Sequence, residues 1–387
     1  FPKEMRTKVS MIIGLVVTLA PTLGPTLGGY ITENISWHFM FLLNVIPGIF
    51  VCTTVFIYVD FDKPNHKLLA NFDFLGVALM ILTLGCLQYV LEEGNKKDWL
   101  DDSNILMLSI LVFVGFVGLI IRELTFSSPI VDLGAFRNRN FSFGCIYSFI
   151  LGVGLYGAVY LLPLFLFSVA GFNTLQIGIT MIVTGSFQLL SAPLAAKVFD
   201  SGLDKRIMLA IGYLTFGFGC YLNSFLTAEA QFWELFLPQM VRGIALMFCF
   251  MPINDLALGT MPKEEIQNAS GLYNLTRNLG GAIGLAFINS LIIAKSKIFA
   301  QSMKESMSIT SPIVQEYIGS LTSMLSGKVD NPELAAYALL DNTVNQEAFI
   351  IAINNIFIII ALMFCLSTLL LPFTSVVENQ GGNSGGH

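Results

Sequence analysis

The stretch that decides the fold is Ala20-Pro21-Thr22-Leu23-Gly24-Pro25-Thr26-Leu27-Gly28-Gly29-Tyr30, inside an apolar run from Val9 to Ile31. That run matches the roughly 20 residues that a helix needs to cross a bilayer. Its prolines and glycines weaken the helix in isolation, and they leave one face open to close approach by a neighbour. The pattern predicts either a plain packing seam or a bend where two halves of the protein meet. The crowding of Gly-Pro and Gly-Gly favours the bend.

The rest of the chain is equally apolar. It has 387 residues, a mean hydropathy of +0.73, 55% hydrophobic residues and only 12% charged residues. Soluble domains are about 25% charged, so these values exclude a cytosolic enzyme. The net charge of −6 and the isoelectric point near 5.1 give no basic surface for nucleic acid. The composition identifies an integral membrane protein.

Ten apolar stretches are long enough to cross a bilayer as helices. They are Val9–Ile31, Phe39–Val59, Phe74–Leu91, Ile105–Ile121, Phe141–Val169, Leu175–Phe199, Ile207–Leu226, Leu235–Leu258, Ala269–Ala294 and Phe349–Leu371. We therefore predict an all-α integral membrane protein with ten transmembrane helices in this chain.

The positive charges predict that both chain ends are cytoplasmic. With the N-terminus inside, most lysines and arginines fall on the inner side, and the short outer connections hold only Lys96 and Lys97. Trp37, Trp99 and Trp233 then all lie on the outer side, where tryptophan anchors helices at the membrane interface. The two signals agree.

One long polar segment, from Lys295 to Glu347, is not expected to cross the membrane. It contains Pro312 and Pro332 and a helical pattern from Glu333 to Leu340. We predict a loop of about fifty residues on the outer face, long enough to be functional.

No enzyme site is evident in the sequence. The six cysteines lie in apolar runs without CxxC spacing, and the histidines (His38, His66, His387) are scattered, which disfavours a metal site or a membrane-embedded enzyme. The run Gly152-Val153-Gly154-Leu155-Tyr156-Gly157 spells a dinucleotide pattern but has no flanking strand. We expect no catalytic residue, no metal and no cofactor.

Two arginines, Arg242 and Arg277, lie well inside predicted spans. A charge at that depth costs about 2.5–3.5 kcal/mol on insertion scales, so such residues face a protein interior or snorkel to the interface. Asp255, near the inner end of the preceding span, is a candidate partner for Arg277. The nearby Asn254 and Asn274 line a cavity or brace helices, and the sequence favours neither reading.

Acidic residues are missing at mid-depth in all ten stretches. A proton-driven carrier usually needs such a carboxylate, because its pKa responds to changing access. A coupling acid is therefore expected upstream, at a span edge, or not at all.

The motifs resemble a known family. Ala20–Tyr30, followed by Ser36-Trp37 and Phe41-Leu42-Leu43-Asn44-Val45, resembles the antiporter motif in the fifth helix of major facilitator superfamily drug–proton antiporters. The continuation resembles the fourteen-helix branch and its EmrB type of multidrug permease. This closer likeness rests on Ser128–Leu133, Phe136–Phe141, Leu162–Leu164 and Asn274–Gly284.

The resemblance implies a domain organisation. Residues 1–60 would end the N-terminal six-helix bundle, 61–125 would form two extra linker helices, and 126–372 would form the C-terminal bundle with a periplasmic loop at 295–347. Residues 373–387 would be a cytoplasmic glycine-rich tail. The ten spans would be helices five to fourteen, so we expect a fragment whose first four helices lie upstream.

By the same resemblance, the chain would be a proton-coupled multidrug efflux transporter of the bacterial inner membrane. It would export lipophilic or amphipathic compounds by alternating access, driven by the proton gradient without a cofactor. An EmrA-type periplasmic adaptor and a TolC-type outer-membrane channel would complete the route. A metabolite or siderophore exporter of the same superfamily, or an inactive truncated remnant, are the alternatives.

Three groups of residues are the candidate sites. The antiporter motif residues, which would seal the contact between the bundles, are Pro21, Gly24, Pro25, Gly28 and Gly29, with Gly28 expected to be critical. The polar network or cavity comprises Arg277, Asn274, Asp255, Arg242 and Asn254. The adaptable substrate wall of aromatic and methionine side chains comprises Tyr156, Phe165, Met247, Phe250 and Met251.

Overall fold

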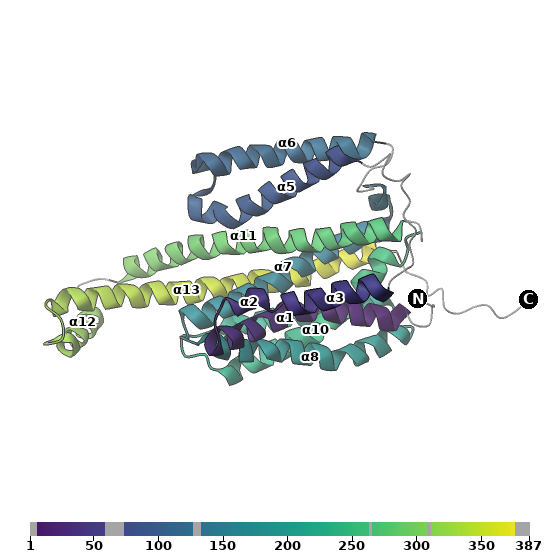
Figure 1. Ribbon diagram of the computed structural model, residues 1–387. Coiled ribbons are helices and arrows are strands. Elements are labelled where there is room, and N and C mark those ends of the chain that lie inside the picture. The colour runs from purple at the N-terminus through teal and green to yellow at the C-terminus, as the bar shows by residue number, and fades with distance from the viewer. Residues whose placement is uncertain (1–5, 59–72, 127–132, 263–264, 308–310, 376–387) are drawn as a thin grey trace, which may run out of the picture.

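The computed structural model describes residues 6–58, 73–126, 133–262, 265–307 and 311–375. Every regular element in these ranges is helical, and the long helices run roughly side by side (Figure 1). Nine helical segments of the described chain are long and apolar enough to cross a membrane. The predicted all-α membrane fold is confirmed.

The helices match most of the predicted stretches, but α11 and α13 are longer than predicted. Their bounds are α1 (Arg6–Asn34), α2 (Phe39–Leu42), α3 (Val45–Tyr58), α5 (Phe74–Glu93), α6 (Ser103–Thr125), α7 (Arg139–Ser168), α8 (Thr174–Asp200), α9 (Lys205–Leu222), α10 (Phe232–Leu258), α11 (Ile266–Ser306), α12 (Pro312–Leu325) and α13 (Pro332–Ser367). Short 3₁₀ turns are η2 (Gly94–Lys97), η3 (Trp99–Asp101), η4 (Leu133–Arg137), η5 (Asn223–Phe225) and η6 (Thr368–Phe373). The first predicted span lies in α1, which is long enough to cross a bilayer at 29 residues but is not among the nine apolar segments.

Short polar side chains cap the starts of several helices. Asp102 and Asn138 each accept hydrogen bonds from two backbone N–H groups in the first turns of α6 and α7. At α8, Asn173 and Gln176 form a reciprocal capping box. These caps satisfy N–H groups that no helical carbonyl can reach, so they fix where the helices begin.

Helices α7 to α11 and α13 share one large apolar core. Aromatic rings fill its centre, and the rings of Phe216 and Phe364 stack with their centroids 4.4 Å apart. Tyr147 and Tyr213 meet edge to face at 5.4 Å, an arrangement that adds attraction beyond the burial of area. Outside this bundle, α1 packs along α8 and also reaches α10.

The α5–α6 hairpin stands to one side of the bundle (Figure 1). Its two helices pack mainly against each other, and its turn reaches α11 through Asn95. The Asn95 amide donates to the Ser290 hydroxyl at 2.9 Å, and the Trp99 indole N–H donates back to Asn95 Oδ1 at 3.3 Å. This polar contact ties the turn of the hairpin to α11.

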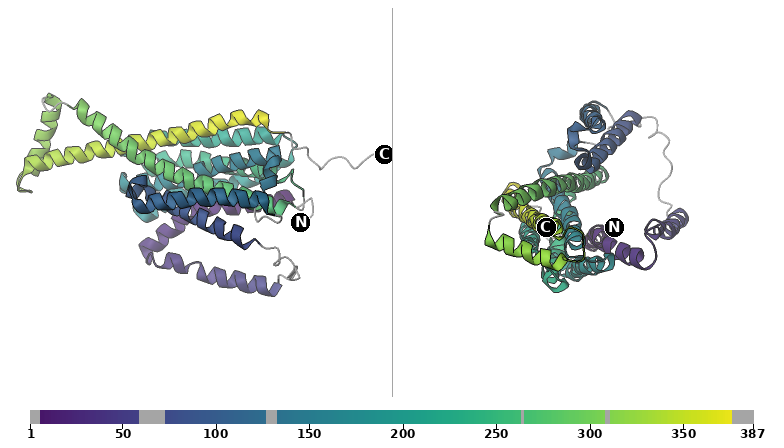
Figure 2. Two further views of the ribbon diagram at one scale, coloured as in Figure 1. Left: turned by 90° about the horizontal axis from the view of Figure 1, so that it is seen from above. Right: turned by 90° about the vertical axis from the view of Figure 1, so that its left-hand side faces the viewer.

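The segment predicted as a loop at 295–347 is mostly helical in the residues that the structure describes. Helix α11 continues to Ser306 and α13 begins at Pro332, so both helices project past the bundle and are joined by α12 (Figures 1 and 2). The expectation equated polarity with loop, but these segments are rich in alanine, leucine, lysine, glutamate and glutamine, which favour helix. The helix expected from Glu333 to Leu340 is present within α13.

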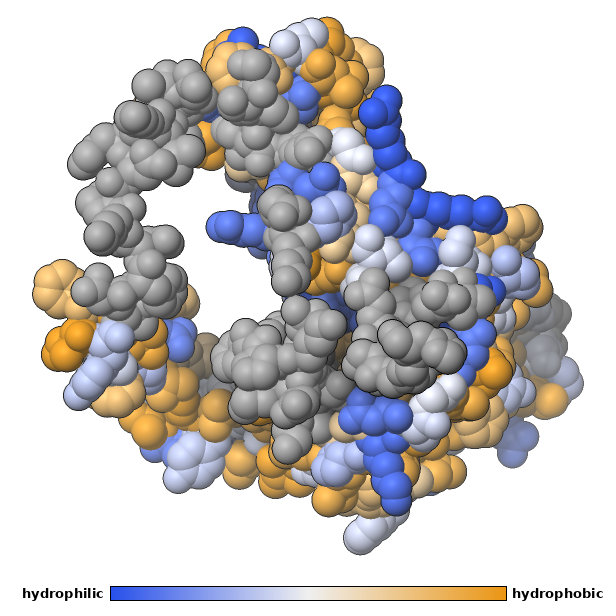
Figure 3. Space-filling view, turned by 90° about the vertical axis from the view of Figure 1, so that its right-hand side faces the viewer, coloured by the Kyte–Doolittle hydropathy of each residue, from blue (hydrophilic) through white to orange (hydrophobic). Residues whose placement is uncertain are grey.

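The start of α1 and the end of α13 lie at the same end of the molecule (Figure 1). Figure 3 views that end, and hydrophilic side chains project from it beside the apolar flanks. Residues 376–387 of the tail and all of residues 61–72 lie outside the described residues.

An ion pair joins the two helices of the α5–α6 hairpin at this end. Asp73, just before α5, accepts from the Arg122 Nε with both carboxylate oxygens at 3.1 Å, and it also accepts from Gly76 N–H. The Arg122 guanidinium holds the pKa of the Asp73 carboxyl below its ordinary value of 3.8.

Replacing Asp73 should therefore weaken the hairpin in a pH-dependent way. Because the pKa of Asp73 is lowered in the folded protein, the charged pair stabilises the fold at pH values above the ordinary aspartate pKa. This stabilisation is lost as the pH falls through the lowered pKa. We expect Asp73→Asn to lower the melting temperature at pH 7, with the difference from wild type shrinking towards pH 3. Thermal unfolding in detergent across that range measures it, and a constant difference would contradict the assignment.

Candidate transport site

The antiporter motif meets α8 in a close backbone contact. Gly29 is buried, and a Cβ atom there would overlap the carbonyl oxygen of Thr174. Opposite, a Cβ at Gly178 would lie 2.8 Å from the Thr26 Cα. The Thr26 hydroxyl donates to the Gly178 carbonyl at 2.7 Å. Only glycine at both positions allows the two helices to come this close.

The two ends of this α1–α8 seam are held by different kinds of contact. Beyond Gly29, the Thr174 hydroxyl donates to the Glu33 carboxylate at 2.9 Å. Towards the start of α1, Leu15 packs against a small cluster that includes Met247 and Met251 of α10. Methionine adapts to changes in packing, so one end of the seam is rigid and the other is deformable.

The motif residues divide between two faces of α1. Pro25 and Gly29 lie towards α8, with the Pro25 carbonyl 3.2 Å from a Cβ built at Gly178. Gly28 instead faces the Met40 sulfur on α2, 3.2 Å from its Cβ position. Gly24 is exposed and has nothing within 4 Å of its Cβ position. The side chain of Pro21 lies outside the described residues.

Arg277 lies in the interior of the bundle, 5% exposed, on α11. Its Nη2 donates to Asn274 Oδ1 at 2.7 Å, and its guanidinium carbon lies 5.5 Å from the Phe250 ring centroid. Its Nη1 has no hydrogen-bond partner among the described residues. The structure thus brings Arg277, Asn274 and Phe250 together.

Asp255 has a different partner from the one predicted. Its Oδ2 lies 2.5 Å from Lys205 Nζ at the start of α9, so the expected Asp255–Arg277 contact is wrong. The two helices that carry Asp255 and Arg277 barely touch, since α10 packs mainly on α8 and α9 while α11 packs on α7. Asn254 is half-buried on α10.

Arg242 is 2% exposed and passes beside Gly219 of α9. Its Nε and Nη1 have no hydrogen-bond partner within the part of the chain that the structure describes. One turn away on α10, Gln239 accepts from the Thr184 hydroxyl at 3.0 Å and donates to Asn223 Oδ1 at 3.4 Å. A buried polar layer therefore crosses α8, α10 and η5.

Thr184 and Gln239 were not predicted as members of this layer. The available signal was the spacing of Gln239 and Arg242, three residues apart and so on one helix face. The partner from α8 carries no such signal, because only the packing of α8 on α10 brings Thr184 to Gln239.

The predicted substrate wall lies mostly in packed interior. Phe165, Met247, Phe250 and Met251 are each at most 2% exposed, and Tyr156 is half-buried with its ring against Gly281. In this conformation these side chains contact neighbouring helices. Their contact with substrate stays a prediction.

The glycines of the dinucleotide-like run serve helix packing. A Cβ at Gly152 would overlap the Arg277 carbonyl oxygen, and one at Gly154 would overlap the Phe364 ring. Gly157 abuts Ile288. All three lie inside α7 and let α11 and α13 approach it.

Membrane-length helices around one core, with a glycine seam where a further helix docks on it, define a multi-pass membrane transporter. The family model described as Major Facilitator Superfamily matches residues 1–285. The chain belongs to this superfamily, and its relatives place it in the EmrB type.

Three relatives illustrate that likeness. The chain is 34% identical over 373 residues to the Colistin resistance protein EmrB of Acinetobacter baumannii, covering 96% of this chain and 73% of the relative. It is 28% identical over 359 residues to the Multidrug export protein EmrB of Escherichia coli, covering 92% and 69%. It is also 28% identical over 364 residues to the Fatty acid resistance protein FarB of Neisseria gonorrhoeae, covering 93% and 69%.

Removing the Arg277 side chain should abolish transport without unfolding the protein. Arg277→Ala deletes the hydrogen bond to Asn274 and the contact with Phe250. We expect the variant to reach the membrane in normal amounts and to lose substrate export. Unchanged turnover in a dye-efflux assay would reduce Arg277 to a packing residue.

Arg242 allows a contrasting stability test. Because Arg242 has no carboxylate within ion-pair distance among the described residues, Arg242→Met removes a buried charge that costs about 2.5–3.5 kcal/mol on insertion scales. We expect an unchanged or higher melting temperature in detergent. Arg122→Met, which breaks the pair with Asp73, serves as the control and should lower it. A marked destabilisation by Arg242→Met would show that the arginine makes stabilising contacts.

Proposed function

We propose that this chain forms the permease of a proton-coupled multidrug efflux system that works by alternating access. The observation that carries the proposal is the α1–α8 seam, where Gly29 and Gly178 bring two backbones into contact. By the family resemblance, α1 belongs to one bundle and α8 to the other. The seam is then a contact across which the bundles move.

The seam supplies the barrier that such a transporter needs. A contact between bare backbones leaves no room for water or ions, so it limits leak when that side is closed. At the other end of α1, the methionine cluster around Met247 and Met251 can repack as the helices tilt, because methionine is flexible and unbranched. This combination of a fixed and an adaptable contact supports a rocking motion.

The proposed substrates are lipophilic or amphipathic compounds. The named relatives act in colistin, multidrug and fatty acid resistance, and amphipathic character is common to colistin and fatty acids. The half-buried Tyr156 and the interior Phe250 and Met251 would contact such compounds when the bundles part. Arg277 and Asn274 would supply the polar contacts of the same cavity.

We propose that the proton gradient drives export and that no cofactor takes part. Proton coupling is the general expectation for this superfamily. Arg277 Nη1 has no hydrogen-bond partner in the described part of the chain, and the Arg277–Asn274 pair is proposed to form different contacts in the two access states.

The proposed setting is the bacterial inner membrane with both chain ends cytoplasmic. The support is the excess of basic residues at that end and the three tryptophans at the other. An EmrA-type periplasmic adaptor and a TolC-type outer-membrane channel are proposed to carry the substrate onward.

A pair of glycine variants in α1 of the full-length protein tests the seam. Gly29→Ala places a methyl group against the Thr174 backbone, whereas Gly24→Ala meets nothing within 4 Å. Overpacking of this kind costs about 1–3 kcal/mol, so we expect Gly29→Ala to lose most ethidium export and Gly24→Ala to retain it. Membrane insertion of both is checked by fluorescence of a fused reporter. Equal export by the two variants would remove the support for the seam.

A further inference from the structure

The helices that project past the bundle reach beyond the lipid. The Asn95–Ser290 contact lies beside Trp99, an interfacial residue type, and marks the outer membrane boundary on α11. From Ser290 to the end of α11 at Ser306, the helix rises about 24 Å, whereas the headgroup layer is only about 5–8 Å thick. The projecting element, defined as residues 295–306, 312–325 and 332–349 and here called the outer hairpin, therefore stands largely in water.

Large apolar side chains are exposed on the outer hairpin. Ile313 is 78% exposed, Leu334 67% and Tyr337 39%. Lipid cannot cover them at this height. Clustered apolar exposure in water is typical of a protein-binding surface.

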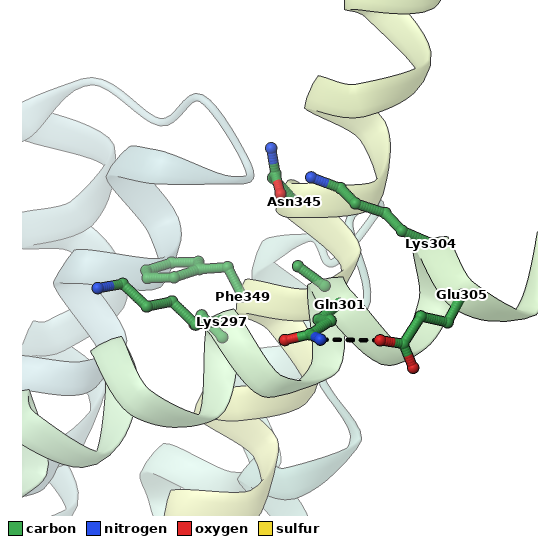
Figure 4. A pocket seen from close by; sticks show the side chains of 8 residues that line it. Lys297, Gln301, Lys304, Glu305, Asn345 and Phe349 are labelled. Carbon is green, nitrogen blue, oxygen red and sulfur yellow. Dashed lines mark hydrogen bonds between the residues drawn. The ribbon is translucent and has the colours of Figure 1, made fainter.

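Two cavities lie next to each other along this element and share Lys304 as a lining residue; together they are here called the groove. One of about 560 Å³ lies between α11 and α13, where Lys297, Gln301, Asn345 and Phe349 line it (Figure 4). The other, of about 590 Å³, lies between α12 and α13 and is lined by apolar side chains that include Leu334.

The groove has the length of a short helix. Lys304 lines both cavities, so the two lie side by side at this residue. On α13 the lining residues Leu334, Tyr337, Asp341, Asn345 and Phe349 recur every three or four positions and form one stripe. From Leu334 to Phe349 the stripe spans about 22 Å, or four helical turns.

An ion pair holds the groove in shape. Lys304 Nζ lies 2.6 Å from Asp341 Oδ1 and so ties α11 to α13. Beside it, the Gln301 amide donates to the Glu305 carboxylate at 2.8 Å, as Figure 4 shows. A groove fixed in advance loses little freedom when a partner binds.

The position of the groove limits which kinds of molecule can bind in it. The end of α13 lies at the opposite end of the molecule (Figure 1), with the membrane-spanning part between it and the groove. Lipid cannot fill the groove, because the groove stands above the headgroup layer of the membrane. The walls are helices without a free strand edge, and a third helix fits between two others at the usual 8–10 Å axial spacing.

We propose that this groove docks an amphipathic α-helix of a separate protein on the outer side of the membrane. The inference rests on the proposed function, in which a periplasmic adaptor receives the substrate. The partner helix would place apolar residues at i, i+4, i+7 and i+11 against Leu334, Tyr337 and Phe349.

The test uses the full-length transporter in nanodiscs and the purified soluble region of the EmrA-type adaptor as the probe. The groove variant combines Leu334→Glu with Tyr337→Glu. The control variant combines Leu339→Glu with Met324→Glu, which are also exposed apolar residues of the outer hairpin but line neither cavity. We expect the groove variant to weaken adaptor binding in biolayer interferometry by at least about tenfold, and the control to bind as wild type does.

Transport by the same variants in proteoliposomes without adaptor separates the two proposals. We expect wild-type transport from both variants, because the groove is remote from the seam. Absence of transport by the wild type would defeat the proposed function but not the docking site.

Adaptor binding that is absent in wild type, or equal in the groove variant and wild type, would overturn the docking site. Loss of a wild-type dimer in the groove variant, seen by mass photometry, would replace the adaptor with a second copy of this chain.

Discussion

The hydrocarbon of a bilayer offers no hydrogen-bond partner to a peptide group, and this constraint shapes the whole molecule. A helix satisfies its own N–H and C=O groups, so a chain in lipid is limited to helices or closed barrels. All regular structure in the described residues is accordingly helical. The ends of the membrane-spanning helices reach the aqueous side, and the capping side chains Asp102, Asn138 and Asn173 lie at such ends.

Apolar burial gives little attraction between helices that already stand in lipid, so close packing must hold them together. The glycines meet this need, as at Gly29 on α8 and at Gly152 on α11. The absence of water inside the bilayer also makes buried charges expensive, and both interior arginines have nitrogens without a hydrogen-bond partner among the described residues. Groups that cost stability and persist at depth are the ones expected to serve transport.

Outside the lipid, different interactions hold the helices together. In the outer hairpin the helices continue without a bilayer, held by the Lys304–Asp341 ion pair and by α12 packed on α13. Exposed apolar residues there cannot be explained by lipid. The transporter therefore presents two different kinds of surface, a glycine seam within the membrane and a groove outside it.

The sequence alone determined the membrane class, the approximate bounds of most membrane-spanning helices and the special character of the run at Pro25–Gly29, because hydrophobic length and glycine content act locally along the chain. It could not assign the partner of Asp255, the membership of Thr184 in the Gln239 layer, or which glycine meets α8. Those depend on how each helix is rotated about its axis and on which helix lies beside it. Packing of the whole bundle sets both, so only the tertiary structure decided them.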